Sequence, residues 1–308
     1  MNKLGTMPRS WGARRMAFLL ATAAMSLAVL GFAAPALATK PTGAYVNFGD
    51  CPVKNASVNA CLFAQTNSGE FKIGSTTVPL TKPTTLQGGI IYDSAEGIFG
   101  PVTFVNAADG NTLSKTPQTV PGGLLKILAP EGWPEFLRNF FNEFINKGIT
   151  GVTATTELVG EVSLSVINQV TASGTALTLP VRVHLENSFL GNNCFVGSKA
   201  HPIDVELTSG TTSPPEPNKP ISGSVGELEI KEGGNLIIVK KNSLVNNSFA
   251  APVAEGCGSQ ILFGLFTELI NKAVDSQLGL PSAAGHNTAI LNGNQEVADV
   301  EAVKASEK

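Results

Sequence analysis

The amino-acid sequence predicts a mainly β protein, an antiparallel β-sandwich or barrel-like fold with two amphipathic helices packed on the sheet. Apolar and polar residues alternate over 176–185 and over 203–207, which is typical of strands with one buried and one solvated face. The Gly233-Gly234 pair separates two apolar runs and indicates a hairpin. Two other segments, 134–148 and 259–279, repeat apolar residues with the period of a helix.

Residues 1–38 have the composition of a cleavable signal peptide. Four basic residues precede an apolar run from Met16 to Phe32. Ala36-Leu37-Ala38 then supplies the small residues of a cleavage site before Thr39. The apolar run is short for a membrane span and no basic flank follows it. We therefore expect a secreted protein, extracellular or associated with the cell envelope, that is not an integral membrane protein after signal cleavage.

The remainder of the chain predicts a single secreted β-rich domain over 39–298, followed by a charged, disordered tail over 299–308. The signal holds four basic and no acidic residues, so 17 Lys and Arg then face 24 Asp and Glu, a net charge of −7. Nucleic acids and anionic membrane surfaces attract clustered positive charge. This balance argues against nucleic acid as a partner.

All four cysteines lie after the signal, and an even count in an exported chain indicates disulfide bonds. Three pairings are possible, of which we favour Cys51–Cys61 and Cys194–Cys257. Zinc is the alternative, but a zinc site needs closely spaced cysteines or nearby histidines, and neither is present.

Strands are expected wherever alternating or β-branched residues lie between turn signals. The first hairpin joins 69–73 to 76–80 across Gly74-Ser75, and the Gly233-Gly234 hairpin joins 228–230 to 236–239. The remaining strands are expected over 98–105, 159–170, 176–185, 203–207 and 289–297.

The two helices have recognisable starts and ends. Pro134 begins the first helix and Gly148 ends it, whereas Ser259 is the expected N-cap of the second and Gly279 its end. Residues 141–147 match 266–272 at five of seven positions. This similarity predicts a decayed internal duplication of about 51–150 and 184–280, with chance as the alternative.

No catalytic motif is present, and the chain has only three histidines. Five residues on two expected strands would surround a divalent metal if those strands paired: His184, Glu186, His201, Asp204 and Glu206. The favoured interpretation is the solvated face of an antiparallel pair. No cofactor is therefore expected, and a metal-dependent hydrolase is kept as an alternative function.

The first helix carries a stripe of phenylalanines at 136, 140, 141 and 144, which either packs as core or faces a cavity for an apolar ligand. The candidate ligand-facing residues are Phe136, Phe140, Phe141 and Phe144. In the second case the protein would carry a lipid or another apolar small molecule.

Short stretches occur in order along most of the chain after the signal: 47–52 (NFGDCP), 191–198 (GNNCFVGS), 211–212 with 214–223 (TT, PPEPNKPISG), 256–258 (GCG) and 279–282 (GLPS). They resemble stretches of uncharacterised secreted proteins of actinobacteria, to which no activity is assigned. The resemblance implies a secreted β-rich protein and no catalytic residues. We expect a non-catalytic binding or structural component of the cell envelope or extracellular space.

Overall fold

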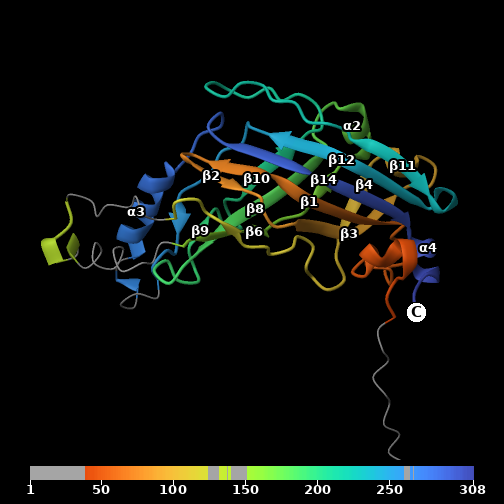
Figure 1. The fold of residues 1–308 in the computed structure, drawn as a ribbon, viewed down its shortest axis with the longest axis horizontal. Coiled ribbons are helices and arrows are strands. Elements are labelled where there is room, and N and C mark those ends of the chain that lie inside the picture. The colour runs from red at the N-terminus through yellow and green to blue at the C-terminus, as the bar shows by residue number, and fades with distance from the viewer. Residues whose placement is uncertain (1–38, 124–131, 137, 140–150, 260–263, 266) are drawn as a thin grey trace, which may run out of the picture. The chain divides into compact units, whose positions relative to one another are not determined.

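The computed structural model describes residues 39–308 except 124–131, 137, 140–150, 260–263 and 266. The expected signal peptide lies outside the described residues. Residues 39–308 form one compact unit. In its described part, two antiparallel sheets of seven strands each are the main elements (Figure 1).

The first sheet, here called sheet 1, has the strand order β11-β12-β14-β1-β3-β4, and β2 pairs with β1 outside this path. Figure 1 shows it nearer the viewer. Its strands are β1 (Ala60–Ile73), β2 (Thr76–Pro79), β3 (Thr84–Tyr92), β4 (Val102–Asn106), β11 (Glu227–Lys231), β12 (Leu236–Asn246) and β14 (Thr288–Asp299).

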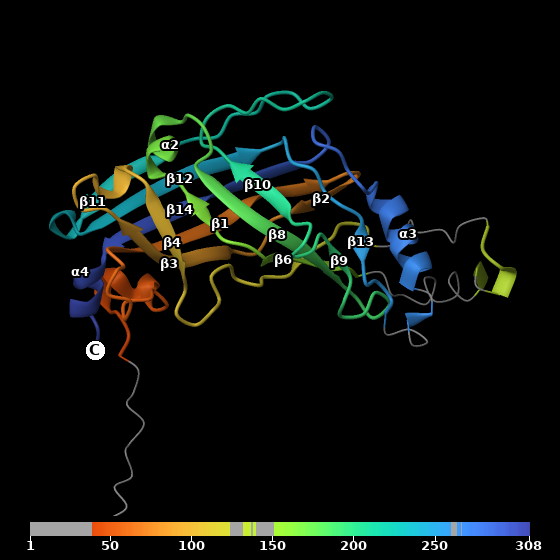
Figure 2. The ribbon, with the colours of Figure 1, turned by 180° about the vertical axis from the view of Figure 1, so that it is seen from behind.

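The second sheet, sheet 2, has the order β13-β9-β8-β6-β5, with β10 and β7 also paired to β8. Figure 2 shows β8 as its long strand. Its strands are β5 (Gln118–Thr119), β6 (Thr153–Leu158), β7 (Ser163–Leu164), β8 (Leu177–Glu186), β9 (Phe195–Val196), β10 (Ile203–Leu207) and β13 (Ala254–Glu255).

The predicted fold class is confirmed, because side chains from both sheets meet in one core. Every second residue of β8 is buried, and these residues pack with Leu86 of β3, Leu244 of β12 and Ala289 of β14. An isolated bridge between Thr208 and Val245 also connects the two sheets. The arrangement is therefore sandwich-like, with the main core between the layers.

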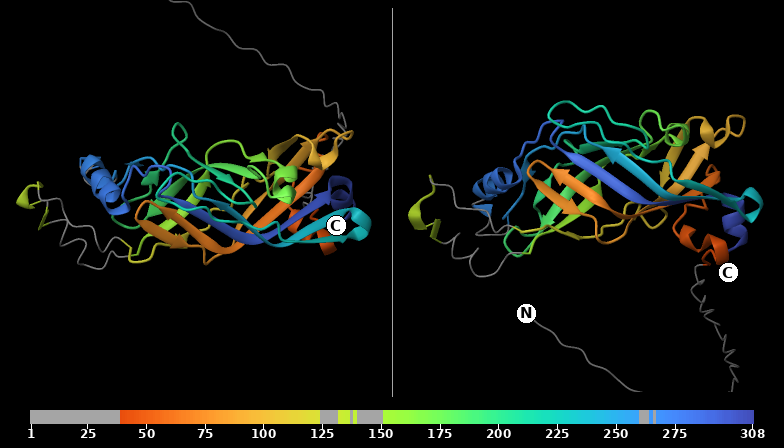
Figure 3. Two further views of the ribbon diagram at one scale, coloured as in Figure 1. Left: turned by 90° about the horizontal axis from the view of Figure 1, so that it is seen from above. Right: turned by 45° about the horizontal axis from the view of Figure 1, so that its top comes forward.

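The helices cover the ends of this sandwich. Figure 3 shows α3 (Thr267–Leu278) at one end of the sheets and α4 (Val300–Ala305) at the other. The third described α-helix is α2 (Val166–Thr171), and the short 3-10 helices are η1 (Gly43–Phe48), η2 (Gly97–Phe99) and η3 (Glu232–Gly234).

Helix α3 matches the expected second helix in its C-terminal part. Ile270, Ala273 and Val274 are buried, and the chain leaves the helix at Gly279 with φ 71°. Ser75, at the tip of the β1–β2 hairpin, donates its N–H to Leu278 O (2.9 Å) and its hydroxyl to Gln277 O (2.8 Å). The hairpin therefore satisfies carbonyl groups that a helix end leaves unpaired. Ser259, the expected N-cap, lies in a turn before the first described turn of α3.

Three sequence expectations are wrong. The expected strand 159–170 is instead β7 followed by α2, because the Ser165 side chain accepts the Asn168 N–H and caps a helix there. The expected strand 98–105 begins only at Val102, after Pro101, which has no N–H for a strand ladder. The expected disordered tail forms α4, which Asp299 caps and whose Val300 and Val303 are buried beside Phe48.

Most of the expected first helix lies outside the described residues, so the internal duplication stays a prediction. Within the described part of the chain, no helix is both long and apolar enough to cross a bilayer.

The predicted disulfide pairing is confirmed. Cys51 is bonded to Cys61 at the start of β1, and Cys194 is bonded to Cys257, joining the segments beside β9 and β13. All four residues are buried. Two disulfides are typical of proteins from oxidising, extracellular environments.

Candidate functional site

The five candidate metal ligands do not come together. Strands β8 and β10 do pair, but Asp204 lies opposite Pro180 and Glu206 opposite Thr178. His184 and Glu186 lie further along β8, where its neighbours are β6 and β9. His201 is exposed in the turn before β10. Among the described residues, no group of three or more His, Cys, Asp or Glu is placed to hold a metal ion.

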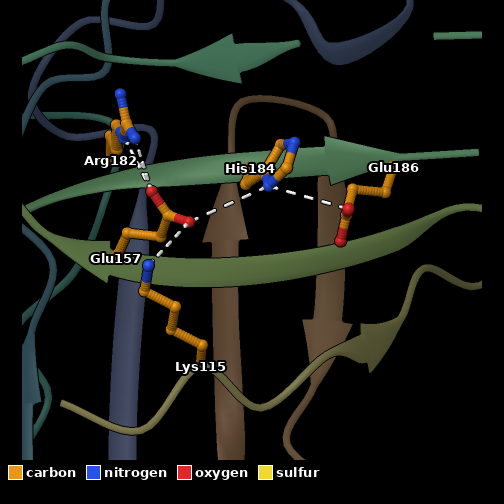
Figure 4. Close-up of polar contacts among 5 residues, drawn as sticks. All are labelled: Lys115, Glu157, Arg182, His184 and Glu186. Atoms are coloured by element: carbon orange, nitrogen blue, oxygen red, sulfur yellow. Dashed lines mark hydrogen bonds and ion pairs between the residues drawn. The ribbon is translucent and has the colours of Figure 1, made fainter. Parts of the chain in front are cut away.

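His184 belongs instead to an ion cluster on the outer face of sheet 2, made of Lys115, Glu157, Arg182, His184 and Glu186 (Figure 4). Both Nε and Nη2 of Arg182 donate to Glu157 Oε2, at 2.9 and 2.6 Å. His184 Nδ1 is 3.9 Å from one carboxylate oxygen of Glu157 and 3.9 Å from one of Glu186. The cluster balances two carboxylates against two permanent cations.

An aromatic ring covers part of this cluster. Phe195 of β9 stacks on His184 with ring centroids 4.4 Å apart, and the Arg182 guanidinium carbon lies 3.8 Å from the Phe195 ring centroid. His184 Nε2 and Thr155 Oγ1, on residues directly opposite in the β6–β8 ladder, are buried without a hydrogen-bond partner among the described residues. The arrangement fastens β6, β8 and β9 together.

We expect Glu157→Gln to lower the free energy of unfolding by about 2 kcal/mol, because it weakens two charge-assisted hydrogen bonds from Arg182 at a carboxylate that is 12% exposed. Urea unfolding measures the change. Glu268→Gln is the matched control, since it breaks an ion pair with Lys272 on an exposed helix face and should leave stability nearly unchanged. If both variants change the free energy of unfolding by the same amount, the ion cluster contributes no more to stability than an exposed ion pair.

A cavity lined by both sheets, here called cavity 1, lies between them. Its volume is about 90 Å³, measured as the space open to the centre of a water-sized sphere. Sheet 1 contributes Phe71, Leu86 and Leu244, and sheet 2 contributes Leu179 and Val205. The full lining is Ala64, Gln65, Thr66, Phe71, Leu80, Thr84, Leu86, Leu113, Thr156, Leu177, Leu179, Val181, Val205, Leu207, Asn242, Leu244, Ala289, Leu291, Gly293, Asn294 and Gln295.

A second cavity of about 50 Å³, cavity 2, follows between the same sheets toward α3. Its lining includes Val183 and Leu185 of β8 and Leu278 of α3. Phe71, Leu80 and Thr156 line both cavities. Movement of these three side chains would therefore join the two spaces into one.

Neither cavity has a charged residue in its lining. Most of the lining is aliphatic, and the polar groups of cavity 1 are amides and hydroxyls. Such a site holds uncharged, largely apolar molecules, because a charge without a partner is expensive to remove from water.

Of the predicted ligand-facing phenylalanines, only Phe136 is described by the structure. Phe136 is 68% exposed and lines neither cavity, whereas Phe140, Phe141 and Phe144 lie outside the described residues. Most lining residues come from strands of the two sheets, and among these strands β8 was recognised from its alternation of apolar and polar residues. That alternation was the available signal for the cavity wall.

Comparisons with known proteins find no relative for this chain. No protein-family model, no curated protein and no solved structure matches it. Its function must therefore be inferred from the site itself.

Proposed function

We propose that this chain is an exported, non-catalytic binding protein that holds a small apolar molecule between its two sheets, in the extracellular space or the cell envelope. The observation that supports this is the uncharged cavity between the sheets, lined by both of them. The two disulfides support the extracellular part of the proposal. No three of the five metal candidates are grouped among the described residues, so we do not propose the hydrolase.

Unfilled space of this size is unusual in a protein core, where side chains pack to the density of organic crystals. Small residues in the lining, Ala64, Ala289 and Gly293, maintain this space. A bound apolar molecule would supply the van der Waals contacts that the cavity lining lacks. We infer that binding such a molecule is the function of this space.

The size of the space indicates the size of the ligand. An engineered apolar cavity of about 150 Å³ binds benzene. Cavities 1 and 2, at about 90 and 50 Å³, approach that volume once Phe71, Leu80 and Thr156 move aside. The ligand, or the part of it held here, is accordingly about the size of a six-carbon ring or a short alkyl chain.

Native mass spectrometry of the protein purified from its own host tests the proposal directly. We expect a co-purifying neutral mass that is released on unfolding. A bare protein mass, together with no uptake of benzene in an NMR titration, would contradict the proposal.

We further expect Ala64→Leu to weaken benzene binding at least tenfold, because the three added carbons occupy cavity 1. The free energy of unfolding should stay equal or rise, since the leucine fills space. Ala302→Leu on α4, which adds the same atoms away from both cavities, is the control and should bind benzene like the wild type. Unchanged binding by Ala64→Leu would place the ligand elsewhere.

A further inference from the structure

One buried side chain in cavity 1 has hydrogen-bonding capacity that the protein does not use. Asn242 of β12 is only 4% exposed and lines the cavity. Its side chain makes no hydrogen bond to any residue that the structure describes. An amide at the cavity wall without a protein partner is available to bind a hydrogen-bonding group in the cavity.

A bulge in β12 places Asn242 on the inner face of sheet 1. The pairing with β14 shifts register between Val239 and Asn242, and Lys241 has φ 54°. The Lys241 N–H donates to Asn294 Oδ1 at 3.0 Å, which holds the bulge in place. Asn242 and Leu244 then share the face that lines the cavity. Bulges often direct a side chain into a binding site in this way.

A second amide lies next to Asn242. Asn242 pairs with Gly293 of β14, two residues from Gln295, which is also buried and also lines the cavity. Gln295 Oε1 accepts a hydrogen bond from Gln169 Nε2 of α2, so Gln295 has a fixed position. Its Nε2 makes no hydrogen bond in the described part of the chain. One end of cavity 1 is therefore polar, and the remainder is mainly apolar.

We propose that the ligand of cavity 1 is an uncharged molecule with an apolar body and one hydrogen-bonding group, such as an alcohol, ketone or amide, which binds the Asn242 amide. This inference depends on the proposed function. An amide both donates and accepts, so it suits each of these groups. A carboxylate is excluded, because no cation lines the cavity to offset its desolvation.

Benzene, phenol and benzoate form a matched set of probes, since all three contain the same ring. Benzene has no polar group, phenol has a neutral hydroxyl and benzoate has a charged carboxylate. NMR titrations of the whole secreted chain at pH 7 compare their affinities. A purely apolar cavity disfavours phenol, because its hydroxyl loses water without gaining a partner. We expect the wild type to bind phenol at least as tightly as benzene, and to bind benzoate at least tenfold more weakly.

Asn242→Leu removes the amide and keeps the branching and the number of side-chain heavy atoms, although leucine is the larger residue. We expect it to weaken phenol binding about tenfold and to leave benzene binding unchanged. Its Tm should equal or exceed that of the wild type, because an unpaired buried polar group is lost. Ser243→Ala, on the opposite face of the same strand, is the control and should bind all three probes like the wild type. If the leucine variant does not fold, Asn242→Ala replaces it.

The outcomes separate this inference from the proposed function. If the wild type binds benzene but Asn242→Leu binds phenol as tightly as the wild type does, Asn242 has no role in ligand binding. The proposed binding function would still hold in that case. Benzoate binding as tight as phenol binding would overturn the neutrality of the ligand. Failure of every probe to bind, with no co-purifying molecule, would contradict the proposed function itself.

Discussion

Asn287→Ala should lower the free energy of unfolding by about 4 kcal/mol. Asn287 is 0% exposed and lies directly before β14. Its Nδ2 donates to Phe249 O at 2.8 Å, to Ala283 O at 3.1 Å and to Ser282 O at 3.4 Å. Its Oδ1 accepts the Gly74 N–H at 2.8 Å. Alanine would leave these four backbone groups without their side-chain partner.

Urea unfolding at neutral pH measures this effect. Asn287→Asp should cost at least as much, because a carboxylate cannot donate to three carbonyls and is costly to bury. Asn292→Ala is the matched control, since Asn292 lies on the same strand and its side chain makes no hydrogen bond among the described residues. It should stay within about 0.5 kcal/mol of the wild type. A loss below about 1 kcal/mol for Asn287→Ala would show that other groups or water replace the amide.

Removing the Cys194–Cys257 bond by a double substitution to alanine should cost about 4 kcal/mol. The bond closes a loop with a sequence separation of 63, and a longer closed loop removes more entropy from the unfolded chain. The Cys51–Cys61 bond, with a separation of 10, should contribute about 3 kcal/mol on the same basis.

The comparison of the two double variants is the sharper measurement, because both bonds are buried and each variant removes two sulfur atoms. Denaturant unfolding should rank the Cys194→Ala/Cys257→Ala variant below the Cys51→Ala/Cys61→Ala variant. The reverse order would show that local packing of the four sulfurs, and not loop length, determines the contribution of each bond.

The sequence predicted those strands whose two faces differ in solvation. β8 and β10 were recognised because buried and partly exposed residues alternate along them. β3 was missed, since its Gly88-Gly89 pair suggests a turn. Side chains there are excluded by crowding: a Cβ on Gly88 would lie 2.3 Å from Val105 O. Such crowding depends on neighbouring strands, which a local pattern does not contain.

The candidate site shows the same limit. From the sequence, an apolar ligand was only an alternative to plain core packing, and it was placed beside a helix with several aromatic residues, of which Phe136 is exposed. The cavity instead lies among aliphatic residues. Taken singly, none of these differs in the sequence from other apolar residues of a strand. The amide of Asn242 reaches it only through a bulge, which depends on pairing with β14. Spaces between two layers arise from the pairing of distant segments, so composition does not locate them.

The position of β14 has a consequence for how the chain folds. β14 ends at Asp299, yet in the strand order it lies between β12 and β1 and is the connection between the two halves of sheet 1. β14 pairs with both β12 and β1, so sheet 1 stays in two parts until β14 has been synthesised. Pairing between segments so far apart in sequence is slow. We therefore expect sheet 1 to be completed late in folding.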